Sequence, residues 1–551
     1  MTATTLPPAP APTRSGRGGR TLTGTGALVK LWLRRDRIML PVWVYALTAY
    51  SVGTAYSFKG LNKTPASRHN FAAGIIHNGA LKAMYGPIVD PDSIGGLVAW
   101  RNGVTGAAMV AVMSVLLVVR HTRAEEETGR LELIGATVVG RRAPLTAGLL
   151  IAVTANVLVA LLSSLGMMVL GLPAAGAVAF GLAWAATGLV FAAVAAVTAQ
   201  LTESGRTANG LALAALGAAY LVRAAGDAGS GASWLTWLSP VGWAEQVRPY
   251  GGDRWWVLLI SLACAAALAA AAYTLTGRRD LAAGILPVQP GPARAAPSLR
   301  TPFALAWRLQ RGSLYAWGAG FAVYGLAIGS IADGVNDMVK GSSGTRKLLT
   351  DLGGGGHRGV VDAFLATVTG IMGLLAAVYT VQAVLRLRSE ETGQRLEPLL
   401  ATSVGRIRWA LGHLVIIALG TAAMLALMGM AVGLTHGLRT GDVGGQLPRI
   451  AGAALAQLPA VWLIAAVTVA LFGLAPRAAL GGWGVLTACL LLGQLGPVLK
   501  LPQWAMDLSP FTHVSKLPGG TFSAVPPAWL TALALLLAAA GLAGFRRRDL
   551  S

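Results

Sequence analysis

The sequence predicts an all-α integral membrane protein with about twelve transmembrane helices, built as two tandem repeats of six. Three observations support this prediction. Of 551 residues, 54% are hydrophobic and only 12% are charged, whereas about a quarter of a soluble chain is charged. Apolar stretches long enough to cross a hydrocarbon core roughly 30 Å thick recur along the chain. One charged phrase occurs twice, at Glu125–Arg141 and at Ser389–Arg406.

The apolar stretches fall into two sets of six. Their charge-poor length is what a helix needs to span a bilayer, and Gly429 and Gly433, four residues apart in one of them, predict close helix packing. We expect transmembrane helices near residues 38–58, 97–119, 145–170, 174–200, 208–226 and 255–276 in the first half, and near 313–333, 361–385, 408–434, 450–473, 479–497 and 527–545 in the second.

The two halves begin and end alike. Each last apolar stretch closes with Arg-Arg-Asp-Leu, at Arg278–Leu281 and at Arg547–Leu550. Each first stretch follows an amphipathic, arginine-bearing segment, Ala27–Arg37 or Phe303–Arg311, which suits a helix lying in the membrane interface. We therefore expect a disordered cytoplasmic tail at 1–20, a first six-helix half at 21–283, a proline-rich cytoplasmic linker at 284–302 and a second half at 303–551.

The formal charge of +22 indicates membrane topology and not a nucleic-acid partner. Most basic residues fall on one side of the predicted helices, the bias that marks the cytoplasmic side, and the sequence has no nucleic-acid-binding motif. We expect both termini in the cytoplasm. Cys264 and Cys489 lie inside apolar stretches, and His413 and His436 are far apart, so neither pair predicts a disulfide or a metal site.

The repeated phrase joins the second and third predicted helices of each half. It reads EEETGRLELIGATVVGR first and SEETGQRLEPLLATSVGR later; when the shared Glu-Glu-Thr-Gly is aligned, the second copy has one residue inserted near Gln394. Gly129 and Gly393 are expected to turn the chain at the membrane surface, before a short helix with an apolar side. Clustered glutamates are unusual there because that surface favours Lys and Arg. Both copies therefore predict docking elements, with Glu–Arg pairing at a solvated helix end as the alternative.

The repeated phrase, the plan of six plus six helices and the closing Arg-Arg-Asp-Leu resemble the permeases of ABC-2-type exporters, with their type V exporter-like architecture. From about residue 25 onward the chain is similar to the actinobacterial branch of polyketide-antibiotic, or tetronasin-resistance-type, exporter permeases. The resemblance implies an elbow helix before each first span and a coupling helix between the second and third. The residues it implies in coupling to an ATPase are Glu126, Glu127, Gly129, Arg130, Leu131, Glu132, Arg141, Glu390, Glu391, Gly393, Leu396, Glu397 and Arg406.

The chain itself is not expected to hydrolyse ATP. It contains no phosphate-binding G-x-x-x-x-G-K-[ST] and no LSGGQ-like signature. The resemblance therefore implies a transporter subunit without a cofactor of its own, served by two copies of a separate ABC ATPase that hold ATP and Mg²⁺ on the cytoplasmic face. Pro398 stands where the first copy has Leu133, and proline is expected to shorten or bend the second coupling helix.

A few charged and polar residues interrupt the apolar stretches. Arg101 and Arg223 lie toward the predicted outer ends, where long side chains reach the interface; an outward-facing gate is the functional alternative, and Asp362 is a candidate partner of Arg101. In the resembled family the second, fifth, eighth and eleventh spans line a central cleft, although interhelical hydrogen bonding is the alternative for each polar residue. The further candidates for the substrate pathway are Asn102, Thr105, Thr369, Gln382 and Gln494.

These observations favour the permease subunit of an ATP-binding cassette exporter in a bacterial cell membrane. It would move hydrophobic or amphiphilic small molecules, such as antibiotics and drugs, out of the cell. A proton-coupled secondary multidrug transporter is an alternative, but the sequence shows no carboxylate near the middle of a span. A non-transporting membrane regulatory subunit is the other alternative.

Overall fold

The computed structural model describes residues 21–549 apart from 62–63, 77–78, 136–137, 229–232, 281–282, 287–290, 292, 295, 333–358 and 496–501. Every regular element in this part of the chain is helical, which confirms the predicted all-α membrane protein. The chain divides into two compact units, Met1–Gly291 and Pro292–Ser551, with the division inside residues 284–302. The tail expected at 1–20 lies outside the described residues.

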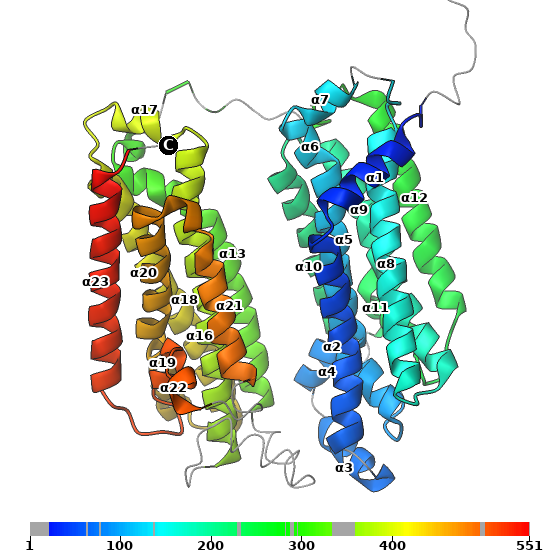
Figure 1. Ribbon diagram of the computed structural model, residues 1–551. Coiled ribbons are helices and arrows are strands. Elements are labelled where there is room, and N and C mark those ends of the chain that lie inside the picture. Colours follow the sequence, from blue (N-terminus) through cyan, green and yellow to red (C-terminus); the bar gives the residue numbers. More distant parts are fainter. Residues whose placement is uncertain are drawn as a thin grey trace, which may run out of the picture. The chain divides into compact units, whose positions relative to one another are not determined.

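The first unit runs from α1 to α12 (Figure 1). Its long helices lie side by side, and α6 and α7 sit at one end of them, with α3 at the other. The helices of this unit are α1 (Thr25–Arg35), α2 (Met39–Leu61), α3 (Pro65–Ile76), α4 (Gly79–Tyr85), α5 (Ile94–His121), α6 (Arg123–Glu127), α7 (Arg130–Gly135), α8 (Ala143–Val169), α9 (Ala174–Leu201), α10 (Gly205–Ala228), the 3₁₀ turn η1 (Ser233–Leu238), α11 (Pro240–Gln246) and α12 (Trp256–Arg278).

The second unit repeats this plan with fewer short helices in its described residues. In Figure 1 the short helix α17 lies at the end of the unit where α23 finishes. The elements are η2 (Pro297–Leu299), α13 (Pro302–Ile331), α16 (Val360–Thr392), α17 (Leu396–Leu400), α18 (Arg406–Thr440), α19 (Val443–Leu455), α20 (Leu458–Leu474), η3 (Pro476–Ala478), α21 (Gly481–Leu495), α22 (Gln503–Met506), η4 (Pro510–His513) and α23 (Val525–Arg547).

Each expected span coincides with one helix, except that residues 450–473 fall on α19 and α20, which together make one candidate span, Val443–Leu474. Fewer than twelve are long enough to cross a membrane alone. Within the described residues, ten helices are long and apolar enough, and α1 with α2, bent by 70°, would be an eleventh. The span expected at 479–497 is α21, whose apolar part, Gly481–Gly493, is shorter. Residues 496–501, which follow α21, are not described.

The elbow helix expected before each first span is a separate element in one unit only. In the first unit, α1 ends at Arg35 and α2 begins at Met39. Pro41 in the first turn of α2 has no N–H to donate, so a break just before it costs little. In the second unit, α13 runs unbroken from Pro302 to Ile331, because no proline or other break follows its first residue.

Small residues let the central helix of the first unit approach its neighbours. α9 packs against α5, α8 and α12, and most of its residues are buried. A Cβ added at Gly106 of α5 would overlap the ring of Trp184, whose Nε1 donates to the carbonyl oxygen of Gly103 at 3.1 Å. The apolar mass of α9 therefore serves helix packing.

The second unit confirms the close packing predicted from Gly429 and Gly433. A Cβ at Gly429 would lie 2.7 Å from the Cα of Ala451, and one at Gly433 would lie 2.6 Å from the Cα of Leu447. Because these neighbours are backbone atoms, only glycine allows α18 and α19 to come this close.

Candidate coupling site

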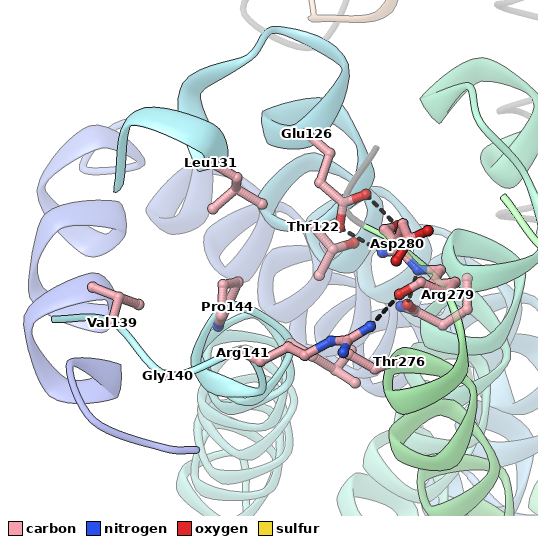
Figure 2. A pocket seen from close by; sticks show the side chains of 12 residues that line it. Thr122, Glu126, Leu131, Val139, Gly140, Arg141, Pro144, Thr276, Arg279 and Asp280 are labelled. Atoms are coloured by element: carbon pink, nitrogen blue, oxygen red, sulfur yellow. Dashed lines mark hydrogen bonds and ion pairs between the residues drawn. The ribbon is translucent and has the colours of Figure 1, made fainter. Parts of the chain in front are cut away.

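An ion-pair cluster around Glu126 fixes the repeated phrase of the first unit to its long helices (Figure 2). Arg279, which follows α12, donates to the Glu126 carboxylate from Nη1 at 2.8 Å and from Nη2 at 2.5 Å. Arg123 of α6 pairs with the same carboxylate, and Arg279 Nε donates to Gln200 Oε1 at the end of α9 at 2.7 Å. The Glu126 and Arg279 side chains are only 9% and 7% exposed, so α6 is tied to the ends of α9 and α12.

The second unit builds the same cluster around Glu391. Arg548, which follows α23, donates to this carboxylate from Nη1 at 2.5 Å and from Nη2 at 2.8 Å, and Arg388 lies 3.0 Å from it. The Arg548 guanidinium carbon lies 5.1 and 5.2 Å from the ring centres of Phe472 and Phe545. We call the pairs Glu126–Arg279 and Glu391–Arg548 the clamps of the two units.

A second arginine supports each clamp from the start of the third span. Arg141 donates to the carbonyl oxygen of Arg279, as Figure 2 shows. Arg406 Nη1 donates to the carbonyl oxygen of Arg548 at 2.6 Å. Each clamp therefore joins three places in its unit: the end of the second span, the start of the third and the end of the last.

The clamps correct the alignment of the two phrases. Glu126 and Glu391, like Arg141 and Arg406, are separated by 265 residues, so no residue is inserted near Gln394. The shared Glu-Glu-Thr-Gly letters are out of step by one. Gly129 has φ of +71° and Gln394 has φ of +55°, whereas Gly393 has φ of −81°. α16 ends at Thr392 and Gly393 lies in the expected turn, but the left-handed residue of that turn is Gln394. The prediction for Gly129 is confirmed.

The acidic residues of the phrase separate into buried and exposed sets. Glu125 and Glu390 are buried, and they lie 3.7 Å from Arg130 and 3.6 Å from Arg395. Like the clamp glutamates, Glu125 and Glu390 therefore pair with arginines of their own unit. Glu127 is exposed, and its Oε2 accepts a hydrogen bond from the backbone N–H of Gly205, the first residue of α10, at 3.0 Å.

The two short helices after the clamps present matching faces. Leu131 and Leu396 are buried, while Glu132 and Glu397, the residues that follow them, are exposed. The first unit adds Leu133, which is 76% exposed. α17 has 5 residues and α7 has 6. The shortening of the second short helix that we expected from Pro398 is therefore small. Pro398 is the third residue of α17, in the first turn, where no intrahelical N–H bond is lost.

A cavity of about 350 Å³ lies between α7 and the clamp of the first unit. Figure 2 shows Leu131, Glu126 and Arg279 on its walls. The clamp thus holds α7 next to a cavity that side chains do not fill. The residues lining this cavity are Thr122, Glu126, Leu131, Val139, Gly140, Arg141, Pro144, Leu145, Gln200, Thr276, Arg279 and Asp280.

Sequence reasoning missed a second ionic contact at this end of the first unit. Asp36, fully buried between α1 and α2, accepts from His121 Nε2 at 2.7 Å and lies 3.2 Å from Arg120. Arg35 pairs with Glu125. A single acid inside the basic segment Ala27–Arg37 was the available signal. These pairs fasten α1 to the end of α5.

The interpretation of Arg223 as an interfacial side chain is wrong. Arg223 is fully buried, 3.0 Å from Asp227 and 3.5 Å from Glu245, and it donates to the carbonyl oxygen of Ala83. The short helices α4 and α11 cover it. Neither is an apolar stretch long enough to be recognised in the sequence as a membrane span. The spacing of four residues between Arg223 and Asp227 was the detectable hint.

The other polar candidates of the first unit take part in contacts between helices. The Arg101 guanidinium lies 4.2 Å from the ring centre of Tyr85. Asn102 Nδ2 donates to the carbonyl oxygen of Tyr50 at 3.3 Å, and Thr105 Oγ1 hydrogen-bonds the Tyr50 hydroxyl at 2.9 Å. Asn102 and Thr105 therefore link α5 to α2, as the interhelical alternative describes.

Asp362 and Thr369 of the second unit also have partners within their unit. Asp362 lies 2.6 Å from Arg449 of α19, so its carboxylate is already paired. Thr369 Oγ1 donates to the carbonyl oxygen of Leu517 at 3.0 Å. The backbone of Gln494 belongs to α21, but its side chain lies outside the described residues.

An aromatic cavity of about 310 Å³ lies between α13 and α16 of the second unit. Gln382, exposed on α16, accepts a hydrogen bond from Trp317 Nε1 at 3.2 Å and so orients the indole on its wall. The lining residues are Ala316, Trp317, Gly320, Phe321, Tyr324, Met372 and Leu375. No group of three metal-binding side chains occurs in the described part of either unit.

Comparison with known proteins agrees with this architecture. The family described as "Multidrug efflux system permease Rv1217c, C-terminal domain" matches residues 27–275 and 299–546, one segment in each unit. The multidrug efflux system permease protein Rv1217c of Mycobacterium tuberculosis is 46% identical over 542 residues, which cover 98% of each chain. The chain is therefore a multi-pass membrane protein that belongs to the Rv1217c family of multidrug efflux system permeases.

Proposed function

We propose that this chain is the membrane-spanning subunit of an ATP-driven exporter that moves hydrophobic or amphiphilic small molecules out of the cell. Two copies of a separate ABC ATPase would supply the energy from the cytoplasmic face. Family membership and the name of its relative support drug efflux. The coupling to ATP rests on the repeated phrase and its resemblance to ABC-2-type exporters.

The observation that carries the coupling proposal is the recurrence of the clamp. In both units a short helix with a buried leucine and an exposed glutamate follows a glutamate bound by the last arginine of the unit. A charge-assisted pair with two parallel hydrogen bonds fixes direction as well as distance. A movement of α7 or α17 would therefore be transmitted to the ends of the second, third and last spans of its unit.

The docking surface we propose is narrower than the full acidic phrase. Glu126, Glu390 and Glu391 are occupied inside their own units, so they cannot pair with a partner protein without giving up these ion pairs. Glu132 and Glu397 are exposed and would face the ATPase. The aromatic cavity beside Trp317 supports hydrophobic ligands, because apolar walls accept many shapes.

The test is co-purification and transport with a candidate ABC ATPase subunit, a chain that carries the Walker A and LSGGQ motifs. Reversing the exposed charges in Glu132→Lys with Glu397→Lys should abolish ATPase capture and ATP-dependent drug uptake by inverted vesicles. Asp92→Lys is the matched control, because Asp92 is exposed at the other end of the first unit. Uptake that needs a proton gradient and no ATP would instead establish the secondary transporter. Capture that survives the double reversal would refute the docking surface.

A further inference from the structure

We propose that each unit binds an anionic phospholipid in an arginine-lined groove, at the end of the unit where α7 or α17 lies. The groove of the first unit has a volume of about 610 Å³ and that of the second about 590 Å³. The first is lined by Thr21, Leu22, Arg141, Arg142, Thr146, Tyr273 and Gly277. The second is lined by Gly405, Arg406, Ile407, Arg408, Leu411 and Arg546.

The two grooves occupy the same place in the repeated plan. Each lies between the start of the third span and the end of the last, which are α8 and α12 in one unit and α18 and α23 in the other. Arg141 and Thr146 of the first correspond to Arg406 and Leu411 of the second, again 265 residues apart. The site is thus present twice, in units with different sequences.

The grooves are positive and their charge is not neutralised. No acidic side chain lines either one. Among the described residues, Arg142, Arg408 and Arg546 are exposed and form no ion pair. Arg141 and Arg406 each donate to a backbone carbonyl, which leaves further N–H donors on their guanidinium groups. Arginine donors in this arrangement suit the oxygens of a phosphate.

An apolar surface continues from each groove along the same helix. On α8, the exposed side chains Leu150, Val153, Val157 and Leu161 follow Thr146 at spacings of three or four residues. On α18, Leu411 is followed by Val415 and Leu419. A phospholipid would place its phosphate among the arginines and its acyl chains along this surface. A free phosphate would use only the arginines, so the apolar surface favours the lipid.

Each groove also touches the clamp of its unit. Arg141 and Arg406 belong to the groove and donate to the carbonyl oxygen of the clamp arginine, Arg279 or Arg548. A phosphate held by Arg141 or Arg406 would therefore lie beside the support of the short helix. This consequence rests on the proposed coupling function, but lipid binding itself does not.

The test counts lipids bound to the purified full-length chain by native mass spectrometry after addition of phosphatidylglycerol or phosphatidylcholine. We expect two retained phosphatidylglycerol molecules and no retained phosphatidylcholine. Arg142→Gln should lose one of the two, as should Arg408→Gln with Arg546→Gln, and the combined variant should lose both. Arg439→Gln, exposed at the opposite end of α18, is the matched control and should retain both.

Three results would overturn the proposal. Equal retention of phosphatidylcholine would show that charge does not select the lipid. Displacement of phosphatidylglycerol by millimolar inorganic phosphate would identify a soluble anion site. Equal loss in Arg439→Gln would show binding without a defined site. Unchanged thermal unfolding of each variant, expected for exposed residues, separates lost lipid from lost fold, and none of these results depends on the ATPase.

Discussion

Arg279 and Glu126 lie 153 positions apart in the chain, yet two hydrogen bonds join their side chains, at 2.8 and 2.5 Å. Arg548 and Glu391 repeat this geometry at 2.5 and 2.8 Å. Both carboxylates belong to the end of the second span, and both arginines follow the last. The clamps thus close each unit on itself at the end where the short helix lies.

Removing the charge of a clamp glutamate should destabilise the protein strongly. In Glu126→Gln the shape is kept, but Arg279 and Arg123 lose their shared counter-ion in a buried site. Breaking a buried pair by removing one partner costs about 3–5 kcal/mol. We expect a lower midpoint of thermal unfolding in detergent. Glu132→Gln, on the exposed face of α7, is the control and should change the free energy of unfolding by less than about 0.5 kcal/mol; equal effects in the two variants would contradict the clamp.

The backbone angles of the turn after each clamp give a prediction that aligning the two sequence phrases does not give. Gln394 has φ of +55°, a conformation in which glycine costs less than any other residue. Gln394→Gly should therefore stabilise the second unit, by up to about 1 kcal/mol. Gly129→Ala, at φ of +71° with open space around its Cβ, should destabilise the first unit by a similar amount. Thermal unfolding of both variants checks the opposite signs, and a destabilising Gln394→Gly would show that the turn lies elsewhere.

The buried carboxyl group of Glu245 should make stability depend on pH. Burial, then repulsion from Asp227, raises the pKa of Glu245 above its ordinary value of 4.5, although Arg223 opposes this. The folded chain therefore holds a proton that the unfolded chain releases, so the stability from this group is complete at low pH and is lost as pH rises above 4.5. The other ionisable residues around it are Tyr85, Asp90, Tyr220 and Arg248.

Glu245→Gln is the variant that tests this dependence. Glutamine resembles the protonated acid, so the variant should unfold at nearly the same temperature from about pH 5 to pH 8. The natural chain should unfold at a lower temperature as pH rises over the same range. The exposed Glu132→Gln variant corrects for other titrating groups. An identical pH profile in the Glu245→Gln variant and the natural chain would exclude Glu245 as the source.

The sequence predicted the helices better than it predicted the contacts of charged residues. Long apolar runs report spans directly, because lipid demands length and hydrophobicity. Arg223 was misplaced because the helices that bury it, α4 and α11, have only 7 residues each and no spanning signal. The phrase was aligned one residue out of step because matching letters outweighed the turn, which only backbone angles reveal. The partners of Glu126 and Glu391 lie at the far ends of their units, beyond the reach of local pattern.

The packing of α18 on α19 offers two glycine substitutions with opposite expected signs. Gly433→Ala would place a Cβ 2.6 Å from the Cα of Leu447, so the helices must separate, and overpacking of this kind costs about 1–3 kcal/mol. Gly452 lies inside α19 with no atom within 4 Å of an added Cβ. Gly452→Ala should therefore stabilise the helix by up to about 1 kcal/mol. Thermal unfolding of the two purified variants measures both effects. A neutral Gly433→Ala would show that the two helices are not held at this distance, since no flexible side chain is there to absorb the added methyl group.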